Sequence, residues 1–364
     1  VIDVSASNVS GSASREVEKK IELSEASLLS FDWYLKGSGG YDCMSVSIDG
    51  TLILYRKGDI IVRGSIKRFL LPGEHVLYVS FSKKGTGSPV AKLTDVTISS
   101  NGIIEMDSAF YMCNNDKTAS LLYARNKAEI RIPKSIEVDG NTFNINAIED
   151  NAFEFCADLR NVVIEDSNNE ILVGCNNTAT QVLGLFYNCP LESVYLGRNL
   201  NYNSGSSYGY SPFFRTDRYP IVSLGDSVTA ISPYLYYNNS SLTTITIPKN
   251  VVSIESNAFY GCTNLYKVVN CSNLSFSCGS GDHGRVSYYA KKVVNVNETT
   301  AIGDFQFHTS DNIHYLTNYI GKDSRLILPN SFNEEDYKID VCAFYGYDNI
   351  ESVIIPESVT SIGD

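Results

Sequence analysis

Two stretches of the chain superimpose with a shift of 23 residues, and their apolar positions coincide. The first places apolar side chains at Leu224, Val228, Ile231, Tyr236 and Leu242, and the second at Ile247, Val251, Ile254, Phe259 and Leu265. A short fixed period indicates one supersecondary unit stacked on copies of itself, each burying its neighbour's apolar face. We therefore expect the C-terminal two thirds to form a solenoid, an architecture that disfavours a deep catalytic pocket.

Each unit carries an aromatic residue, a Leu or Ile six residues later, and branched residues three and five positions further on. Phe153 is thus followed by Leu159, Val162 and Ile164. Proline often ends the branched run, as at Pro133, Pro248, Pro329 and Pro356, and because proline has no N–H it ends ladder pairing. The branched runs are therefore predicted to be short parallel strands. We expect their alternate residues to point inward at Val162, Ile164, Val194, Leu196, Val222, Leu224, Ile245, Ile247, Val353 and Ile355.

The first part of the chain has a different pattern. Polar and apolar residues alternate with period 2 around Phe31, Ile48 and Val79, and Asp49-Gly50 is a turn signal. Such alternation predicts antiparallel strands with one buried face, packed as a two-sheet sandwich. The predicted fold is mainly β, with a sandwich over residues 1–105 and a solenoid with a parallel β ladder and short helical turns over residues 106–364.

Composition and charge exclude several classes of function. The net charge of −12 disfavours nucleic acids and anionic membrane surfaces, which bind basic patches. No stretch reaches the ~18 consecutive apolar residues of a membrane helix, so we expect no membrane insertion. The sequence begins at Val1 without Met, and we expect a secreted or surface-attached monomer whose signal peptide has been removed.

The nine cysteines do not form a disulfide framework or a zinc motif in the sequence. Cys156, Cys189 and Cys262 fall at the same place in successive units, just before a leucine, and are expected to be small buried hydrophobes. Cys271 and Cys278 are near enough in sequence to pair across a loop, although free thiols are the favoured interpretation.

The repeat texture resembles the leucine-rich repeats of BspA-like surface proteins, known from Bacteroides and its relatives, treponemes and some protists. The segments 257–265, Asn-Ala-Phe-Tyr-Gly-Cys-Thr-Asn-Leu, and 355–363, Ile-Pro-Glu-Ser-Val-Thr-Ser-Ile-Gly, carry the resemblance. It covers residues 110 to 364, with insertions near 130, 196 and 328 and only loose periodicity over 266–325. The resemblance implies adhesion or recognition of host proteins or glycans at the cell surface.

The N-terminal segment resembles jelly-roll modules of bacterial surface proteins through Phe31-Asp32-Trp33, Ile48-Asp49-Gly50 and Leu71-Pro72-Gly73. Some modules of this shape bind glycans, and by this resemblance Trp33 and Tyr41 are candidates for stacking on a sugar. A place in the sandwich core is the favoured alternative for both. Calcium is a second candidate ligand, because hard cations favour carboxylate oxygens such as those of Asp32, Asp42 and Asp49; solvated turns explain these residues more simply.

A candidate binding face follows from the strands of the solenoid. Positions between the inward residues point outward, and successive coils should align them as a ladder. These positions are Arg131, Val163, Tyr195, Ser223, Thr246, Val269, Ile327 and Ile354. Five of the eight are branched apolar or aromatic residues, which favours a protein or glycan partner; cross-strand packing without any ligand is the alternative.

We predict no enzymatic activity and no cofactor. The sequence holds no nucleophile elbow, phosphate loop or H-E-x-x-H motif, and the six-residue spacing of His308 and His314 suits neither a helix nor a strand metal site. Two alternatives remain. A carbohydrate-binding protein would use the sandwich for recognition and the solenoid as a spacer, whereas a glycosidase would need two carboxylates brought together in a cleft.

Overall fold

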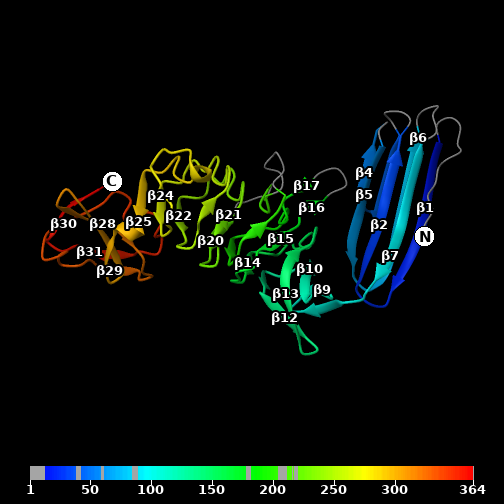
Figure 1. The fold of residues 1–364 in the computed structure, drawn as a ribbon, viewed down its shortest axis with the longest axis horizontal. Helices are drawn as coiled ribbons and strands as arrows, with labels where there is room; N and C mark the ends of the chain where they lie inside the picture. Colours follow the sequence, from blue (N-terminus) through cyan, green and yellow to red (C-terminus); the bar gives the residue numbers. More distant parts are fainter. Residues whose placement is uncertain are drawn as a thin grey trace.

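The computed structural model describes residues 13–37, 42–58, 61–83, 89–177, 182–203, 211–214, 216 and 220–363. The molecule is elongated, with a sandwich of long strands at one end and a row of short coils leading away from it (Figure 1). Its described helical segments are two three-residue 3-10 turns, η2 (His283–Arg285) and η3 (Val296–Glu298), and none could span a membrane.

Seven described strands form the N-terminal sandwich. They are β1 (Ala13–Leu23), β2 (Ser27–Lys36), β3 (Cys43–Ile48), β4 (Thr51–Lys57), β5 (Ile61–Leu70), β6 (Gly73–Lys83) and β7 (Val90–Ser99). One sheet has the order β1-β6-β3-β4 and the other β5-β2-β7, and all described pairings in them are antiparallel. Leu29, Phe31 and Trp33 alternate inward from β2 towards Val46 and Phe81. The predicted two-sheet sandwich is therefore present.

The first coils of the solenoid combine antiparallel and parallel pairing. Their strands are β8 (Ile103–Met106), β9 (Ala109–Cys113), β10 (Thr118–Ala124), β11 (Glu129–Ile132), β12 (Ser135–Val138) and β13 (Asn141–Ile148). Phe69 on β5 packs between this region's aromatic rings, 4.9 Å from Phe110 and 5.2 Å from Tyr123 between ring centroids. Arg68 and Glu154 form an ion pair beside them. These contacts attach the sandwich to the first coils.

The stacked coils then run along the molecule. Their strands are β14 (Asn161–Ile164), β15 (Ile171–Val173), β16 (Asn176–Asn177), β17 (Val182–Leu183), β18 (Ser193–Leu196), β19 (Leu200–Asn201), β20 (Ile221–Leu224), β21 (Ala230–Ile231), β22 (Thr244–Ile247), β23 (Ser253–Ile254), β24 (Lys267–Asn270) and β25 (Lys292–Asn295). Apart from the antiparallel pair β16-β17, the described pairings of these strands are parallel. The order β11-β14-β18-β20 forms one parallel ladder and β22-β24-β25 continues it as a second. The parallel solenoid is confirmed.

The aromatic residues of successive coils line up inside the solenoid. The rings of Phe153 and Phe186 have centroids 4.9 Å apart, and those of Phe186 and Phe213 lie 5.7 Å apart. Phe213 lies 23 residues before Tyr236 and so fits the repeat, although the sequence analysis named only residues 222–224 of its coil. The column is buried throughout, with Phe153 and Tyr236 both fully inaccessible.

The repeated cysteines connect neighbouring coils. Each thiol donates to a backbone carbonyl of the preceding coil: Cys156 to Ala124 at 3.4 Å, Cys189 to Phe153 at 3.5 Å and Cys262 to Tyr236 at 3.1 Å. Burial raises the pKa of each of these thiols to about 12. All nine cysteines are free, Cys271 and Cys278 included, in agreement with the prediction that the repeated ones are buried hydrophobes.

A buried arginine links three further segments of the solenoid. Arg198 is 1% exposed, and its guanidinium donates to the carbonyls of Glu165, Ile145 and Pro133 at 3.0, 2.9 and 2.9 Å. Burial lowers its pKa from the usual value. Because its planar fork presents donors in several directions, one side chain satisfies carbonyls from three segments of the chain.

The C-terminal region departs from the regular stack. Its strands are β26 (Thr300–Ile302), β27 (Phe305–Ser310), β28 (Ile313–Tyr319), β29 (Arg325–Ile327), β30 (Tyr337–Ile339), β31 (Ser352–Ile354) and β32 (Val359–Ile362). They form a five-stranded sheet, β26-β27-β28-β30-β32, and a separate pair, β29-β31. Val353 is partly buried there, but Ile355 is 47% exposed, so the prediction that it points inward is wrong. It lies just beyond β31, where strand alternation no longer sets its direction.

Candidate functional site

The outward side chains of the first ladder lie in register. Arg131 of β11 pairs with Val163 of β14, which pairs with Tyr195 of β18, which pairs with Ser223 of β20. Their intervening neighbours point into the core, because successive residues of a strand face opposite sides. Four coils thus bring residues from distant parts of the sequence into one row across the sheet.

This row is open to solvent to different degrees. Arg131, Ser223 and Thr246 are exposed, whereas Val163 and Tyr195 are half-buried. Thr246 lies on β22, which begins the second ladder and is adjacent to β20. The row therefore continues across five strands with a charged end, an apolar and aromatic centre and two hydroxyls. We call Arg131, Val163, Tyr195, Ser223 and Thr246 the outer row.

Hydrogen bonds hold the two largest side chains of the outer row. Arg131 Nη1 donates to Glu165 Oε1 at 2.8 Å. Burial raises the pKa of Glu165, but the bonds from Arg131 and the Lys134 N–H outweigh it, and the pKa is lowered overall. Tyr195 OH donates to Asp166 Oδ2 at 2.8 Å. Burial and this acceptor raise the pKa of Tyr195 to about 12, so its hydroxyl stays neutral.

A glycine makes room for the Tyr195 hydroxyl. A Cβ at Gly225 would lie 2.4 Å from Tyr195 OH and 2.5 Å from Asp166 Oδ1, far inside van der Waals contact. Glycine at the end of β20 therefore allows the tyrosine and its acceptor to lie flat against the next coil. The centre of the outer row is built by packing and is not a loosely solvated surface.

Three predicted members of the ladder are not part of the outer row, although Val269 does pair in register with Thr246. Val269 on β24 is only 8% exposed. On the same side of that strand, buried Lys267 donates to the Ala343 carbonyl at 2.8 Å and lies 5.3 Å from the Tyr347 ring centroid. The C-terminal region thus covers this part of the face. The prediction that Val269 is an exposed contact residue is therefore wrong.

Ile327 and Ile354 are also separated from the outer row. They pair with each other in the two-stranded sheet β29-β31 and are 68% and 61% exposed. The irregular segment 296–324 interposes antiparallel strands, so the ladder does not pass through it. The prediction of one row of eight residues is therefore wrong in its extent, although both isoleucines do point outward.

One residue of the same surface escaped the sequence analysis. Ile221 is 76% exposed, at the start of β20 and two positions before Ser223. Period-2 alternation places both on the same side of the strand. The signal was available in the sequence, because each strand of four residues has two outward positions and only the second was considered.

The residues proposed for glycan and calcium binding have other surroundings. Trp33 is 6% exposed, with Gly64 against its indole and Arg56 5.2 Å from its ring centroid, which is the core position named as the alternative. Tyr41 lies outside the described residues. Asp32 accepts a hydrogen bond from Ser65 at 2.5 Å.

The other two aspartates have different surroundings from Asp32. Asp42 is fully buried, whereas Asp49 bonds His75 at 2.7 Å and the Val76 N–H at 2.8 Å. Within the described ranges, no group of three or more His, Cys, Asp and Glu side chains is arranged to hold a metal ion. His314 contacts Thr309 and Glu335, whereas His308 contacts the Glu298 carbonyl.

Comparison with protein families decides the classification. A family model described as "BspA type Leucine rich repeat region (6 copies)" matches residues 88–182, 183–280 and 324–364, more than half of the chain. The chain belongs to the BspA-type leucine-rich repeat family. The match leaves out 1–87, most of the sandwich, and 281–323, which holds the antiparallel strands β26, β27 and β28.

Solved structures of leucine-rich repeat proteins are also similar. A leucine rich cell surface protein from Faecalibacterium prausnitzii A2-165 is 21% identical, covering 73% of each chain with a TM-score of 0.24. A leucine-rich repeat protein from Eubacterium ventriosum is 15% identical, covering 71% of this chain and 60% of that one, with a TM-score of 0.23. The pneumococcal vaccine antigen PcpA is 12% identical over 71% of each chain, with a TM-score of 0.19. No curated protein matches.

Membership of the BspA-type family supports a non-catalytic role in surface protein interaction. A repeat protein of this kind presents a row of side chains rather than a deep reaction cleft. The outer row is such a surface in this BspA-type chain.

Proposed function

We propose that this chain is a non-enzymatic, extracellular recognition and adhesion protein that binds a host protein through the outer row. The observation that supports this most is the register Arg131–Val163–Tyr195–Ser223, which aligns a charged, an apolar, an aromatic and a hydroxyl side chain across four coils. Tyrosine and arginine are enriched among residues that dominate the energy of protein interfaces. Their fixed positions lower the entropy lost on binding.

The proposal is tested by replacing the centre of the row. Val163→Ser combined with Tyr195→Ser removes apolar area and an aromatic ring at half-buried positions, with little effect on the core. Binding to a panel of purified extracellular-matrix proteins is measured by biolayer interferometry. We expect the variant to bind its best partner at least about tenfold more weakly, the equivalent of about 1.4 kcal/mol.

Val252→Ser with Tyr260→Ser is the matched control, because it removes the same side chains from exposed positions outside the row. Circular dichroism checks that both variants remain folded. Unchanged binding by the Val163/Tyr195 variant, or an equal loss in the control, would contradict the assignment of the row.

A further inference from the structure

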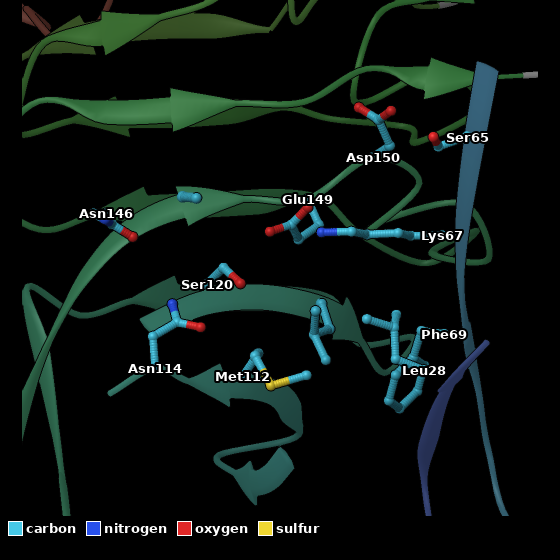
Figure 2. A pocket seen from close by; sticks show the side chains of 12 residues that line it. Leu28, Ser65, Lys67, Phe69, Met112, Asn114, Ser120, Asn146, Glu149 and Asp150 are labelled. Atoms are coloured by element: carbon cyan, nitrogen blue, oxygen red, sulfur yellow. The ribbon is translucent and has the colours of Figure 1, made fainter. Parts of the chain in front are cut away.

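A cavity of about 590 Å³ lies between the sandwich and the first coils of the solenoid. One wall is the outer face of β5, from which Ser65, Lys67 and Phe69 project at alternate positions. The opposite side is formed by residues of β9, β10 and β13 and the turns that follow them (Figure 2). Its volume falls within the range of about 300–1,000 Å³ that is typical of ligand sites.

A second cavity of about 290 Å³ continues from the first. The two share Ala147, Glu149 and Asp150, and the second extends along the solenoid to Leu172 and Asn203. Together they form a groove that begins at the sandwich and crosses the edges of successive coils. Such a shape suits a linear chain of several units better than a single compact molecule.

The backbone of the groove floor is already engaged. β10 pairs with β9 on one side and β13 on the other, and β13 pairs in turn with β15. An extended peptide would gain most from adding a strand to a free sheet edge, which these strands do not offer. On this floor a ligand is therefore recognised by side chains.

Those side chains combine hydroxyl, amide, carboxylate and ammonium groups. Figure 2 shows Lys67 extending from β5 towards Glu149, with Asn146, Asn114 and Ser120 on the facing sheet. Alternating donors and acceptors of this kind match the hydroxyls of a sugar, each of which both donates and accepts. Apolar side chains such as Met112 and Leu28 also line the groove and can contact the C–H groups of sugar rings.

Charge indicates which sugars fit. The groove contains two carboxylates against one ammonium, and the chain has a net charge of −12. Anionic glycans would be repelled, because like charges raise the cost of association. We propose that the groove binds a neutral, linear oligosaccharide, held jointly by the sandwich and the first coils of the solenoid.

The contacts beside the groove preorganise its walls for a ligand. The Phe69 ring is fixed between Phe110 and Tyr123, and the Arg68–Glu154 ion pair has side-chain exposures of only 11% and 20%. On the solenoid side, the Cys175 N–H donates to Asp150 Oδ1 at 2.9 Å. A ligand would thus meet a site whose walls are already held, and would lose less entropy in ordering them.

The test uses the full chain on an array of uncharged oligosaccharides of glucose, mannose, galactose and N-acetylglucosamine, with sialylated glycans as a separate arm. We expect binding on the neutral arm. Glu149→Ala and Asn146→Ala should each weaken it about tenfold or more, as removal of a hydrogen bond to a bound ligand predicts. Ala147→Phe, which fills the space shared by the two cavities, should abolish it.

Glu357→Gln, an exposed change near the C-terminus, is the control and should leave binding unchanged. Glu149→Gln should bind more tightly than Glu149→Ala, because the amide keeps a hydrogen-bonding group at this position. When the best ligand from the array is bound, backbone hydrogen exchange in the folded protein should slow over residues 65–69 and 145–150. Absence of neutral-glycan binding, preference for sialylated glycans, or unchanged binding by folded variants would overturn the proposal. The Val163/Tyr195 variant should bind glycan normally, so that failure of the outer row and failure of the groove remain distinguishable.

Discussion

The rings of Tyr236 and Phe259 lie one on the other, with centroids 4.7 Å apart and planes only 9° from parallel. Both are fully buried, and they occupy equivalent positions in coils separated by 23 residues. A sequence period is thus converted into a physical contact between neighbouring coils. The stability of each coil depends on the ring of the next, as expected for a one-dimensional stack.

Phe259→Ala should lower the free energy of unfolding by about 3–5 kcal/mol, because it leaves a cavity beside Tyr236. Urea unfolding measures the loss, and hydrogen exchange should locate it in the adjacent coils. Tyr260→Ala is the matched control, since Tyr260 is 40% exposed and its ring stacks on Tyr237 near the surface. A larger loss for Tyr260→Ala than for Phe259→Ala would contradict the buried column.

Arg198→Met should destabilise the solenoid by about 3 kcal/mol, because three carbonyls lose their donor at about 1 kcal/mol each. Methionine fills much of the same space, so that the missing hydrogen bonds and not a cavity dominate the result. Arg160→Met is the comparison, as its side chain is 44% exposed and donates to one carbonyl, that of Pro190 at 3.3 Å. Equal midpoint temperatures of thermal unfolding for the two variants would show that the three hydrogen bonds of Arg198 contribute little to stability.

Lys267 gives a pH dependence whose sign follows from its burial. Burial lowers the pKa of Lys267 to about 8, whereas its usual value is 10.5. Between pH 8 and 10.5 the unfolded chain binds more protons at this site, so the contribution of Lys267 to stability rises with pH. Lys267→Met lacks this contribution. The stability of the original protein relative to Lys267→Met should therefore increase from pH 8 to 10.5 and stay constant below pH 8.

This comparison separates Lys267 from the cysteines and tyrosines, which titrate in the same range. Burial raises the pKa of Cys262 and of Tyr337 to about 12, so both favour the folded state less as the pH rises through their unfolded values. The same groups are present in Lys267→Met, and their effect cancels in the difference. A relative stability that falls from pH 8 to 10.5 would rule out a buried, neutral Lys267.

Thiol labelling should distinguish structural cysteines from accessible ones. Cys278 is exposed and should react with iodoacetamide at pH 8 in the folded protein. Cys156, Cys189 and Cys262 should remain unmodified until urea is added, because burial both shields them and raises their pKa. Peptide mass spectrometry measures each site. Labelling of Cys189 as fast as Cys278 would show that the coils do not stay closed.

The sequence was informative wherever one coil repeats another. Phe153, Cys189 and Val194 could be placed inside the stack because each position recurs at fixed distances from an aromatic residue. The pattern could not show that the C-terminal region folds back over Lys267 and Val269, because that contact joins segments about 76 residues apart with no periodic relation. The exposure of Val269 was therefore misassigned.

The groove at the junction was also beyond the reach of pattern analysis. Lys67 lies on a sandwich strand and Glu149 follows a solenoid strand. The packing of Phe69 against Phe110 and Tyr123, with the ion pair beside it, brings those walls together. Neither residue lies in a motif. Period-2 alternation can show which side of a strand such as β5 is outward, but not that this side faces the coils.

The cover over Lys267 sets a limit on what the outer row can hold. Only the strands from β11 to β22 leave their outward side chains uncovered in the row, and four spacings of about 4.8 Å span about 19 Å. The length of the surface that a partner can contact along the solenoid is therefore fixed by the number of uncovered strands. Evolutionary gain or loss of coils before β24 would lengthen or shorten this surface, whereas changes after it would leave it untouched.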